Sequence, residues 1–535
     1  MTAVDGLRTT SRSAGRKLSG WFTRERMTRD NGVLAGIALI TVLAHLISAG
    51  NYGYFRDELY YIAAGRHLAF GYVDFPPMIA WLAALLNVIA GDNLVVIHIV
   101  SALVIGCVVF LTGLMARELG GTRFAQALAA TGSACSLVFL ATGSIFSMDA
   151  LDELWWALGA YVLIRLIRRD DQRLWIVFGL VAGLGVFTKL TMLFFGLGVT
   201  VGVLLTAQRR AFRSRWIWLG GAITLLFLLP YTGWNALNGW PTVAFWQNYG
   251  GLGASPVSFA ATQVLDANPF TIVLWIPGLY FYLFSPLGKR YRAVGLAFVT
   301  CWLVLSVPGV KPYFLTPAYP MLFAGGAVIL ARPLAAGHSA GKARPWLRFG
   351  YLPVLVASGL LLLPLATPLL PPAAFVAGPY EQLAVVGNAG AGQGNGGQFP
   401  QYLGDRFGWR TMAADMQRVY DGLPASERSQ ACILAQNYGE ASALDLYRTA
   451  YGLPPVISGH NSWFLWGPGR CSGTVLLTVG FARADLAKTY SSVQQAMLFT
   501  CVFCMGSENN QPLFVATQPI HGRLSGAWNS VKHFN

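Results

Sequence analysis

The chain has 535 residues, of which 55% are hydrophobic and only 11% are charged, and its formal net charge is +15. A soluble protein could not cover its surface with so few polar residues, and apolar runs of about 17 to 25 residues recur from Val33 to about Leu370, as expected of membrane-spanning helices. The basic residues fall in short clusters between these runs and form no patch with interleaved aromatics, which argues against a nucleic-acid partner. We therefore predict a polytopic α-helical membrane protein embedded in a lipid bilayer.

The first 32 residues form a basic segment ahead of the first apolar run. No convincing small-residue cleavage site follows, so we expect an uncleaved anchor rather than a signal peptide. The charge of segment 1–32 predicts a cytoplasmic N-terminus. Its basic residues are Arg8, Arg12, Arg16, Lys17, Arg24, Arg26 and Arg29.

About eleven apolar runs within residues 33–370 are expected to cross the membrane as one transmembrane domain. The first six runs cover approximately residues 33–49, 94–115, 125–142, 151–167, 174–187 and 190–205. The next four end near Tyr231, before Lys289, near Val307 and before Arg332, and the eleventh covers approximately residues 351–370. This threading puts almost every Lys and Arg between runs on the cytoplasmic side. Residues 50–93 and 233–268 then form outer loops, and the C-terminal part is extracytoplasmic.

After residue 370 the composition changes. Residues 371–398 are rich in Pro and Gly and are predicted to be a linker, and residues 399–535 are predicted to be an extracytoplasmic α/β domain. Strand-like runs such as ACILAQNY and TVLLTVGF alternate there with helical ones such as GEASALDLYRTAYG. Structural disulfides are the favoured interpretation of Cys432, Cys471, Cys501 and Cys504 outside the cytoplasm, while a redox or metal role for the Cys501–Cys504 pair stays open.

Charged side chains gather at the outer membrane face. A charge well inside hydrocarbon costs on the order of 2 to 3 kcal/mol, so such groups normally face a cavity and pair with one another. Carboxylates and cations converging on one face predict a site for a negatively charged, membrane-embedded substrate, of which a lipid phosphate is the obvious example. The residues are Asp57, Glu58 and Asp74 in the stretch YFRDELYYIAAGRHLAFGYVDFPP, Asp149 and Asp152 at the start of the fourth run, and Arg56, Arg66, Lys189 and Lys311.

Each of these residues also has an ordinary interpretation. Asp57 and Glu58 would make an unremarkable solvated pair, Lys189 an interfacial lysine whose ammonium group reaches the headgroups, and Lys311 an anchor beside Tyr313. Asp149 stands where a helix N-terminus is expected. Their coincidence on one side of the membrane favours the functional interpretation.

Four stretches in order, FRDELYYIAAGRHLAFGYVDFPPMIAW, FSMDALDELWWAL, GLGVFTKLTMLFF and KPYFLTPAYPMLFAGGA, resemble the membrane glycosyltransferases of the protein O-mannosyltransferase and aminoarabinose transferase superfamily, which have the GT-C fold and family 39-like members. The paired Asp57 and Glu58 in the first outer loop are the most telling element. The later stretches AQNYGEASALDLY, SGHNSWFLWGP and ENNQPLFVA resemble a bacterial subgroup with an extracytoplasmic C-terminal domain.

This resemblance implies a GT-C-like transferase that moves a sugar from a polyprenyl-phosphate donor to an acceptor in the cell envelope, with inversion at the anomeric carbon. A lipid-linked donor carries its own activated leaving group, so no nucleotide-sugar site is needed. No cofactor is predicted, and a divalent metal stays open without a motif to support it. Asp57 matches the catalytic aspartate of the family, which serves as a base or orienting carboxylate. The implied catalytic residues are Asp57, Glu58 and Asp149, and those implied to bind substrate or lipid phosphate are Arg56, Arg66, Asp74, Lys189, Lys311 and Tyr313.

The sequence departs from the family at two points. Phe75 stands where the aminoarabinose branch has a phosphate-binding lysine, although Asp74 keeps the preceding acid, so phosphate binding must depend on other cations. The outer loop 233–268 contains no histidine that could join an acid in holding a metal, so we predict no protein-bound metal site of that kind.

Two alternatives to an enzyme stay open. A flippase for polyprenyl-linked sugars or a secondary transporter would also explain the helices and charges, but the halves show no internal repeat. A membrane-anchored scaffold would explain the C-terminal domain but not the acidic loop. Two roles stay open for a group of residues in that domain, which could line a carbohydrate-binding surface or have ordinary packing and turn roles. The residues are Tyr438, Glu440, His460, Asn461, Trp463 and 508–510.

Overall fold

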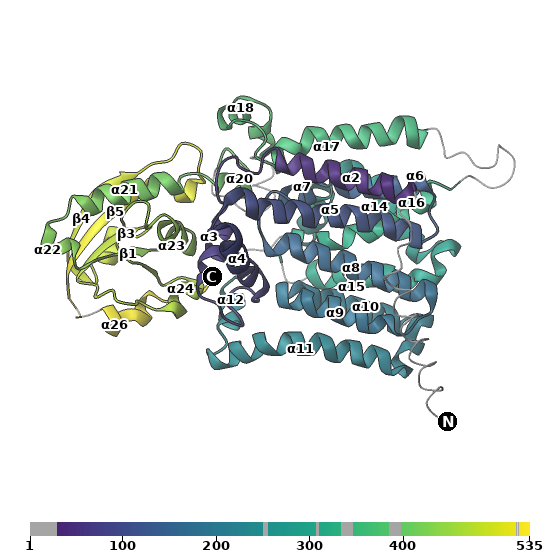
Figure 1. Ribbon diagram of the computed structural model, residues 1–535, viewed down its shortest axis with the longest axis horizontal. Coiled ribbons are helices and arrows are strands. Elements are labelled where there is room, and N and C mark those ends of the chain that lie inside the picture. The colour runs from purple at the N-terminus through teal and green to yellow at the C-terminus, as the bar shows by residue number, and fades with distance from the viewer. Residues whose placement is uncertain are drawn as a thin grey trace, which may run out of the picture.

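The computed structural model describes residues 29–249, 255–306, 310–332, 346–384, 397–520, 522 and 524–535. Almost all of the predicted cytoplasmic segment 1–32 and most of the Gly-rich part of the predicted linker lie outside these residues. The described chain forms a helical part and, at one end of it, an α/β unit, with α3 and α4 between the two (Figure 1).

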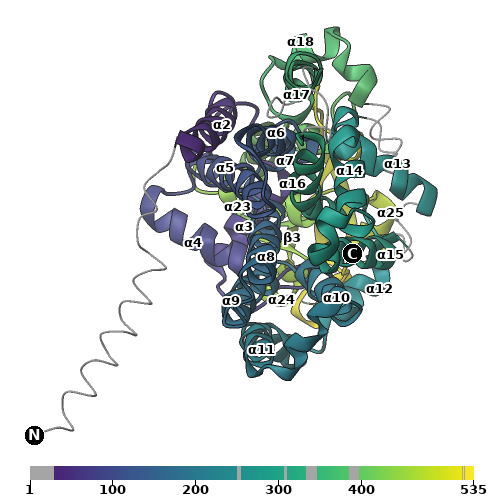
Figure 2. The same cartoon turned by 90° about the vertical axis from the view of Figure 1, so that its right-hand side faces the viewer.

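The helical part consists of mostly apolar helices whose axes are roughly parallel or antiparallel to one another and are seen nearly end on in Figure 2. They are α2 (Arg29–Leu46), α5 (Leu94–Glu118), α6 (Arg123–Ala134), α7 (Leu137–Thr142), α8 (Met148–Arg169), α9 (Leu174–Thr188), α10 (Thr191–Leu204), α11 (Arg215–Leu237), α14 (Ile272–Leu283), α15 (Arg292–Ser306), α16 (Tyr319–Leu330) and α17 (Leu352–Ala366). The shorter helical segments are η1 (Ala207–Arg213), η2 (Pro269–Thr271), η3 (Pro286–Tyr291), η4 (Pro312–Ala318) and η5 (Leu347–Tyr351).

Small residues let neighbouring helices of this part approach closely. A Cβ atom on Gly179 of α9 would lie 2.2 Å from the carbonyl oxygen of Gly220 on α11, so only glycine permits this contact. Polar side chains begin several helices. Asn93 accepts bonds from the backbone N–H groups of Val95 and Val96 at the start of α5, for example.

Four helical segments of the described chain are long and apolar enough to cross a membrane, and six if each of two sharply bent pairs counts as one span. The structure differs from the expected threading in three places. The expected run 125–142 is divided into α6 and α7, α11 continues to Leu237 rather than ending near Tyr231, and the expected outer loop 233–268 contains two helices, α12 (Pro241–Tyr249) and α13 (Pro256–Asp266). The count of about eleven spans stays a prediction.

The charged stretch that follows α2 folds as α3 (Arg56–Arg66), an irregular segment and α4 (Met78–Ala90). The Glu58 carboxylate accepts the backbone N–H of Phe55 at 2.8 Å, which closes the first turn of α3. Pro77 is the N-cap of α4, so Pro76 and Pro77 directly precede the helix, where a missing backbone N–H leaves no helical hydrogen bond unmade. This segment forms the junction between the helical part and the α/β unit (Figure 1).

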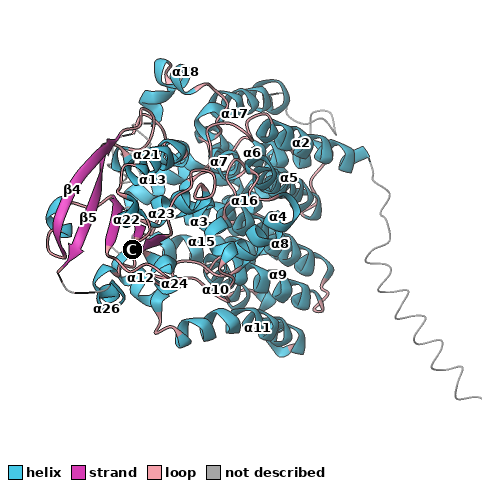
Figure 3. Ribbon diagram, turned by 60° about the vertical axis from the view of Figure 1, so that its left-hand side comes forward, coloured by secondary structure: helices cyan, strands magenta, loops and turns pink. Residues whose placement is uncertain are grey.

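The α/β unit is built on a five-stranded sheet of order β2-β1-β3-β5-β4, magenta in Figure 3. The strands are β1 (Ala431–Ala435), β2 (Val456–Ser458), β3 (Val475–Val479), β4 (Tyr490–Phe499) and β5 (Gln511–Pro519). Its helices are α20 (Gln401–Gly404), α21 (Trp409–Asp421), α22 (Ala425–Arg428), α23 (Tyr438–Leu446), α24 (Asn461–Trp466), α25 (Arg483–Leu486) and α26 (Leu524–Ala527), with short turns η6 (Gly506–Glu508) and η7 (Trp528–Val531), and α18 (Pro372–Ala377) precedes the unit.

Strands β1, β2 and β3 are parallel, while β5 runs antiparallel to β3 and β4. Ile433 in the centre pairs with Val456 on one side and Leu477 on the other. The carboxyl ends of parallel strands commonly carry functional groups, and here α23 and α24 begin directly after β1 and β2. Tyr438 and Asn461 are the first residues of these two helices.

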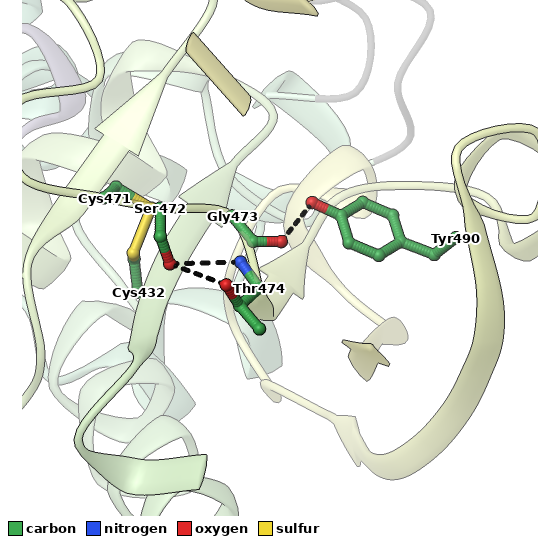
Figure 4. Close-up of a disulfide and its surroundings, with 6 residues drawn as sticks. All are labelled: Cys432, Cys471, Ser472, Gly473, Thr474 and Tyr490. Carbon is green, nitrogen blue, oxygen red and sulfur yellow. Dashed lines mark hydrogen bonds between the residues drawn. A yellow bond between two sulfur atoms is a disulfide. The ribbon is translucent and has the colours of Figure 1, made fainter. Parts of the chain in front are cut away.

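One of the expected disulfides is present. Cys432 in β1 is bonded to Cys471, which precedes β3 (Figure 4). Cys501 and Cys504 are free thiols in the structure, so the expectation of structural disulfides is confirmed for the first pair alone.

Candidate active site

A cavity of about 520 Å³ lies between the helical part and the α/β unit. It brings together charged and aromatic side chains that are far apart in sequence. Its lining residues are Asp57, Tyr60, Tyr61, Asp74, Pro76, Met148, Lys189, Leu190, Thr191, Leu193, Phe194, Phe245, Trp246, Val310, Lys311, Tyr313, Phe314, Tyr438, Asn461 and Asn535. Five of the nine predicted site residues are among them: Asp57, Asp74, Lys189, Lys311 and Tyr313.

Asp57 lies in the first turn of α3, where a carboxylate is favoured by the helix dipole. Its Oδ1 accepts a hydrogen bond of 2.7 Å from the hydroxyl of Tyr438 in the α/β unit. Burial raises the pKa of Asp57, and the Tyr438 hydrogen bond and the charges of Arg56 and Lys311 offset part of that rise. The carboxylate therefore combines access to the cavity with a raised proton affinity, as a general base requires.

Lys189 and Lys311 supply positive charge to the cavity. Lys189 follows the last residue of α9, its side chain is 7% exposed, and its ammonium group pairs with the Asp149 carboxylate in the first turn of α8. The same ammonium group lies 4.2 Å from the ring centroid of Phe314 and 5.2 Å from that of Tyr313. The Lys311 ammonium group lies 6.0 Å from the Tyr313 ring, so this aromatic side chain stands within cation–π range of both lysines.

Asp74 is the second carboxylate of the cavity. Its Oδ1 accepts a bond of 3.0 Å from the Tyr60 hydroxyl, and its Oδ2 lies 3.5 Å from the amide nitrogen of Asn461. Burial raises the pKa of Asp74 to about 7, with a smaller contribution from the charge of Asp57. The charge of the cavity therefore changes near neutral pH.

Arg56 lies beside Asp57 on α3 but does not line the cavity. Its guanidinium group bridges two carboxylates of the α/β unit, Asp405 at 3.1 Å and Glu508 at 2.5 Å. Burial raises the pKa of Asp405 to about 6, although the Arg56 charge opposes that rise. The bridge joins the first turn of α3 to the α/β unit.

The structure does not bring Glu58 to the cavity. Its Oε1 accepts bonds from Nε2 of His98 at 2.8 Å and from the backbone N–H of Phe146 at 2.7 Å. Although burial alone raises the pKa of Glu58, the charge and hydrogen bond of His98 bring it below the ordinary value. Glu58 thus joins α3 to the helical part.

Two further charges lie outside the cavity. Arg66 at the end of α3 pairs with Asp92 at 2.6 Å and with Asp445 at 2.8 Å, and its side chain is 37% exposed. Asp149 does not line the cavity but pairs with Lys189, which does. Ser147 rather than Asp149 caps α8, because the Ser147 hydroxyl accepts the backbone N–H of Ala150.

Phe75, where the resemblance led us to look for a lysine, is fully buried among aromatic rings. Its ring centroid lies 4.7 Å from that of Tyr72, 5.1 Å from that of Tyr61 and 5.3 Å from that of Tyr60. The position therefore belongs to the aromatic core that supports α3, and the cavity takes its cations from Lys189 and Lys311.

Several lining residues were not identified as site residues from the sequence. Tyr60 and Tyr61 of α3 and Phe314 of η4 line the cavity, and all three lie within the stretches that carried the resemblance. Tyr438 and Asn461 line it too, whereas Glu440 and Trp463 are buried within the α/β unit. For His460, burial lowers the pKa to about 4, so the neutral ring accepts the backbone N–H of Tyr438 at 3.2 Å.

Comparisons with known proteins identify relatives of this arrangement. Residues 74–234 match the model of a family described as dolichyl-phosphate-mannose-protein mannosyltransferase. The lipid A galacturonosyltransferase RgtD of Rhizobium johnstonii is 28% identical over 239 residues, which are 42% of this chain and 48% of that protein. The chain thus spans about half the length of the curated relative that it matches.

Solved structures of ArnT from Cupriavidus metallidurans have a similar fold. The structure bound to undecaprenyl phosphate has a TM-score of 0.55 at 14% identity, covering 90% of this chain and 97% of that one. The apo structure has a TM-score of 0.55 at 14% identity, covering 93% and 98%. The chain is therefore a membrane protein with the GT-C fold, and the expected resemblance to GT-C glycosyltransferases is confirmed.

Proposed function

We propose that the protein is a membrane glycosyltransferase that moves a sugar from a polyprenyl-phosphate donor to an acceptor outside the cytoplasm. The observation that carries this proposal is the cavity in which the Asp57 carboxylate and the Lys189 and Lys311 ammonium groups come together. The names of the relatives support it, since one is a lipid A galacturonosyltransferase and ArnT has been solved bound to undecaprenyl phosphate.

The arrangement suits a single displacement. An acceptor oxygen attacks the anomeric carbon, the bond from that carbon to the phosphate oxygen breaks, and its electron pair leaves with the lipid phosphate. Asp57 takes the proton from the acceptor. Lys189 and Lys311 balance the charge that develops on the departing phosphate, and because they are in place beforehand the stabilisation requires little reorganisation. Attack on the face opposite the phosphate inverts the anomeric centre.

The remaining predicted residues are given supporting roles. Asp149 orients the Lys189 ammonium group, and Tyr313 lies within reach of both lysines and helps to shape the phosphate site. Asp74 sets the charge of the cavity near neutral pH. Glu58, Arg56 and Arg66 act indirectly, because their charged groups are engaged by His98 and by carboxylates away from the cavity.

The proposed topology follows the charge distribution. We propose that residues 1–32 are cytoplasmic, that about eleven spans lie within 33–370, and that residues 399–535 form an extracytoplasmic domain after a linker at 371–398. With this orientation the cavity opens at the outer face of the cell membrane, where a lipid-linked donor and a cell-envelope glycan, lipid or protein acceptor would meet.

One experiment separates a transferase from a flippase or transporter. Purified protein in liposomes is given radiolabelled polyprenyl-phosphate sugars and cell-envelope acceptors, alongside an Asp57→Asn variant. The proposal predicts transfer of label to an acceptor by the parent protein and none by the variant. Full activity of the variant would contradict the role of Asp57, and labelled lipid that crosses the bilayer without transfer would favour the flippase.

A further inference from the structure

Asp57 accepts a hydrogen bond from a residue that is 381 positions away in the sequence and lies in the α/β unit. The Tyr438 hydroxyl donates to Oδ1 of Asp57 at 2.7 Å. Within the described part of the chain, Oδ2 of Asp57 has no hydrogen-bond partner. One carboxylate oxygen is therefore held by the α/β unit, while the other remains available to an acceptor hydroxyl.

Tyr438 is itself held from three sides. It is the first residue of α23, where Asn437 and Glu440 form a reciprocal capping box. Its backbone N–H donates to Nδ1 of His460, at the start of α24. Its ring stacks on Tyr60 of α3, with centroids 4.7 Å apart and ring planes 27° from parallel. The hydroxyl group therefore reaches Asp57 from a side chain with little freedom to move.

A second contact fixes the same turn of α3. Arg56, the neighbour of Asp57, is bridged by Asp405 and Glu508 of the α/β unit. Gly439 leaves room for this arrangement, since a Cβ atom there would lie 2.6 Å from Cγ of Arg56. The α/β unit thus contacts the first turn of α3 at two successive residues.

We propose that Tyr438 is a positioning residue for Asp57, and that the α/β unit is for this reason part of the catalytic machinery rather than an appended module. The proposal rests on the proposed transferase function. The hydroxyl group orients the carboxylate and favours its ionised form, because a donated hydrogen bond stabilises a carboxylate more than a carboxylic acid.

The charge of Asp57 is set by groups from five elements. Arg56 and Tyr61 lie on its own helix, Asp74 on the segment before α4, and Tyr438 on α23. Two further groups are Lys311, which precedes η4, and Asp405, which follows α20. Of these, Tyr438 is the group that donates a hydrogen bond to Asp57 within the described part of the chain, so its removal changes the proton affinity of Asp57 with little change in net charge.

The test is the full-length Tyr438→Phe variant, which keeps the ring that stacks on Tyr60 and loses the hydroxyl group. The matched control is Tyr420→Phe in the same unit, whose hydroxyl bonds the exposed Arg428 carbonyl at 3.3 Å. Transfer rates are measured from about pH 5 to 9, because burial raises the pKa of Asp57 above that of an ordinary aspartate.

We expect kcat of Tyr438→Phe to fall about tenfold and KM for the donor to stay unchanged. The acid limb of the kcat/KM profile, where activity rises as Asp57 loses its proton, should move to higher pH by about one unit. That shift corresponds to the free energy of one hydrogen bond to a charged group. The direction follows because the lost bond raises the pKa of Asp57, the group that must be ionised. The Tyr420→Phe control should keep the parent rate and profile. Replacing Tyr438 with 3-fluorotyrosine, a stronger donor of the same size, should move the acid limb to lower pH.

Parent kinetics in Tyr438→Phe together with an inactive Asp57→Asn would overturn this inference and leave the transferase function standing. So would a fall in rate that is equal at every pH, since a purely structural role predicts it. An unchanged acid limb with 3-fluorotyrosine would also count against the inference. An active Asp57→Asn variant would instead refute the role proposed for Asp57, and a parent protein that transfers no label to any acceptor would refute the proposed function itself.

Discussion

Lys189, directly after α9, forms an ion pair with Asp149 in the first turn of α8 at the edge of the cavity. The Lys189 side chain is almost fully buried, and the Phe314 ring covers its ammonium group. A buried cation that is paired with a carboxylate and covered by an aromatic ring is pre-oriented, and an incoming phosphate would meet it with little reorganisation.

Replacing Lys189 with methionine removes the charge and keeps most of the volume. We expect kcat/KM to fall by about 100- to 1000-fold, or about 3 to 4 kcal/mol, as for other preorganised groups that stabilise developing charge. Asp149→Asn is the matched variant, because it leaves the cation and removes its partner, and its fall should be smaller, about tenfold. Equal activity of Lys189→Met and the parent would show that Lys311 alone serves the phosphate.

Asp74 should make the binding of lipid phosphate depend on pH. Burial raises its pKa to about 7, so the side chain is mostly neutral at pH 6 and mostly ionised at pH 8. Ionisation adds a negative charge to the cavity, and we expect binding of polyprenyl phosphate to weaken by about fivefold, which corresponds to about 1 kcal/mol. The measurement is Kd by fluorescence titration at both pH values.

Asp74→Asn separates this effect from the titration of the phosphate itself. The amide keeps an oxygen that can accept the Tyr60 hydrogen bond and carries no charge at either pH. The component of the pH dependence that Asp74 causes should disappear in this variant. If both proteins weaken equally between pH 6 and 8, Asp74 does not control the charge of the site.

Breaking the Arg56 bridge should loosen the junction. Asp405→Asn removes one of two carboxylates from a largely buried guanidinium group, and we expect the free energy of unfolding to fall by about 1 to 3 kcal/mol. The readout is the midpoint of thermal unfolding in detergent. Asp485→Asn is the control, because its ion pair with Lys488 is exposed and should contribute little. A larger fall in the control than in Asp405→Asn would contradict the importance of this bridge.

The Cys432–Cys471 disulfide should stabilise the α/β unit by about 2 to 4 kcal/mol, because it joins β1 to the segment before β3 across 39 residues. Dithiothreitol is expected to lower the unfolding midpoint of the parent protein and to have little effect on a Cys432→Ser/Cys471→Ser variant. The Cys501→Ser/Cys504→Ser variant should respond to dithiothreitol like the parent, since both thiols are free. An identical response of all three proteins would mean that the disulfide adds no stability.

Hydropathy and charge led us to group nine charged and aromatic residues into one site, and five of them do line one cavity. Hydropathy and charge did not predict which residues form ion pairs or hydrogen bonds with these side chains. Asp445 of the α/β unit pairs with Arg66 at the end of α3, and no local sequence pattern encodes that contact. The Tyr438–Asp57 bond was missed for the same reason, because it spans 381 residues.

Long-range contacts also explain why the expected run 125–142 is two helices. The break lies at Cys135 and Ser136, where the sequence contains no proline. The amide nitrogen of Asn268 donates to the Cys135 carbonyl at 2.9 Å, so a distant side chain satisfies a backbone group that an unbroken helix would have paired. A hydropathy window sees only the apolar character on both sides of this break.

Phe75 offers a test of the resemblance itself. A lysine at this position would serve the phosphate if the local structure matched the aminoarabinose branch, but here Phe75 is 1% exposed and packs on Tyr60, Tyr61 and Tyr72. We expect Phe75→Lys to lower the free energy of unfolding by about 3 to 5 kcal/mol, because it removes a buried ring and places an ammonium group among aromatics.

Phe75→Leu is the control for packing alone and should cost less, about 1 to 2 kcal/mol. Both are measured by thermal unfolding and by binding of polyprenyl phosphate. Since Phe75 supports α3 rather than lining the cavity, Phe75→Lys should not bind the lipid phosphate more tightly than the parent. A stable Phe75→Lys protein that binds the lipid phosphate more tightly would mean that the segment before α4 can turn this side chain into the cavity. The new lysine would then join Lys189 and Lys311 in binding the phosphate.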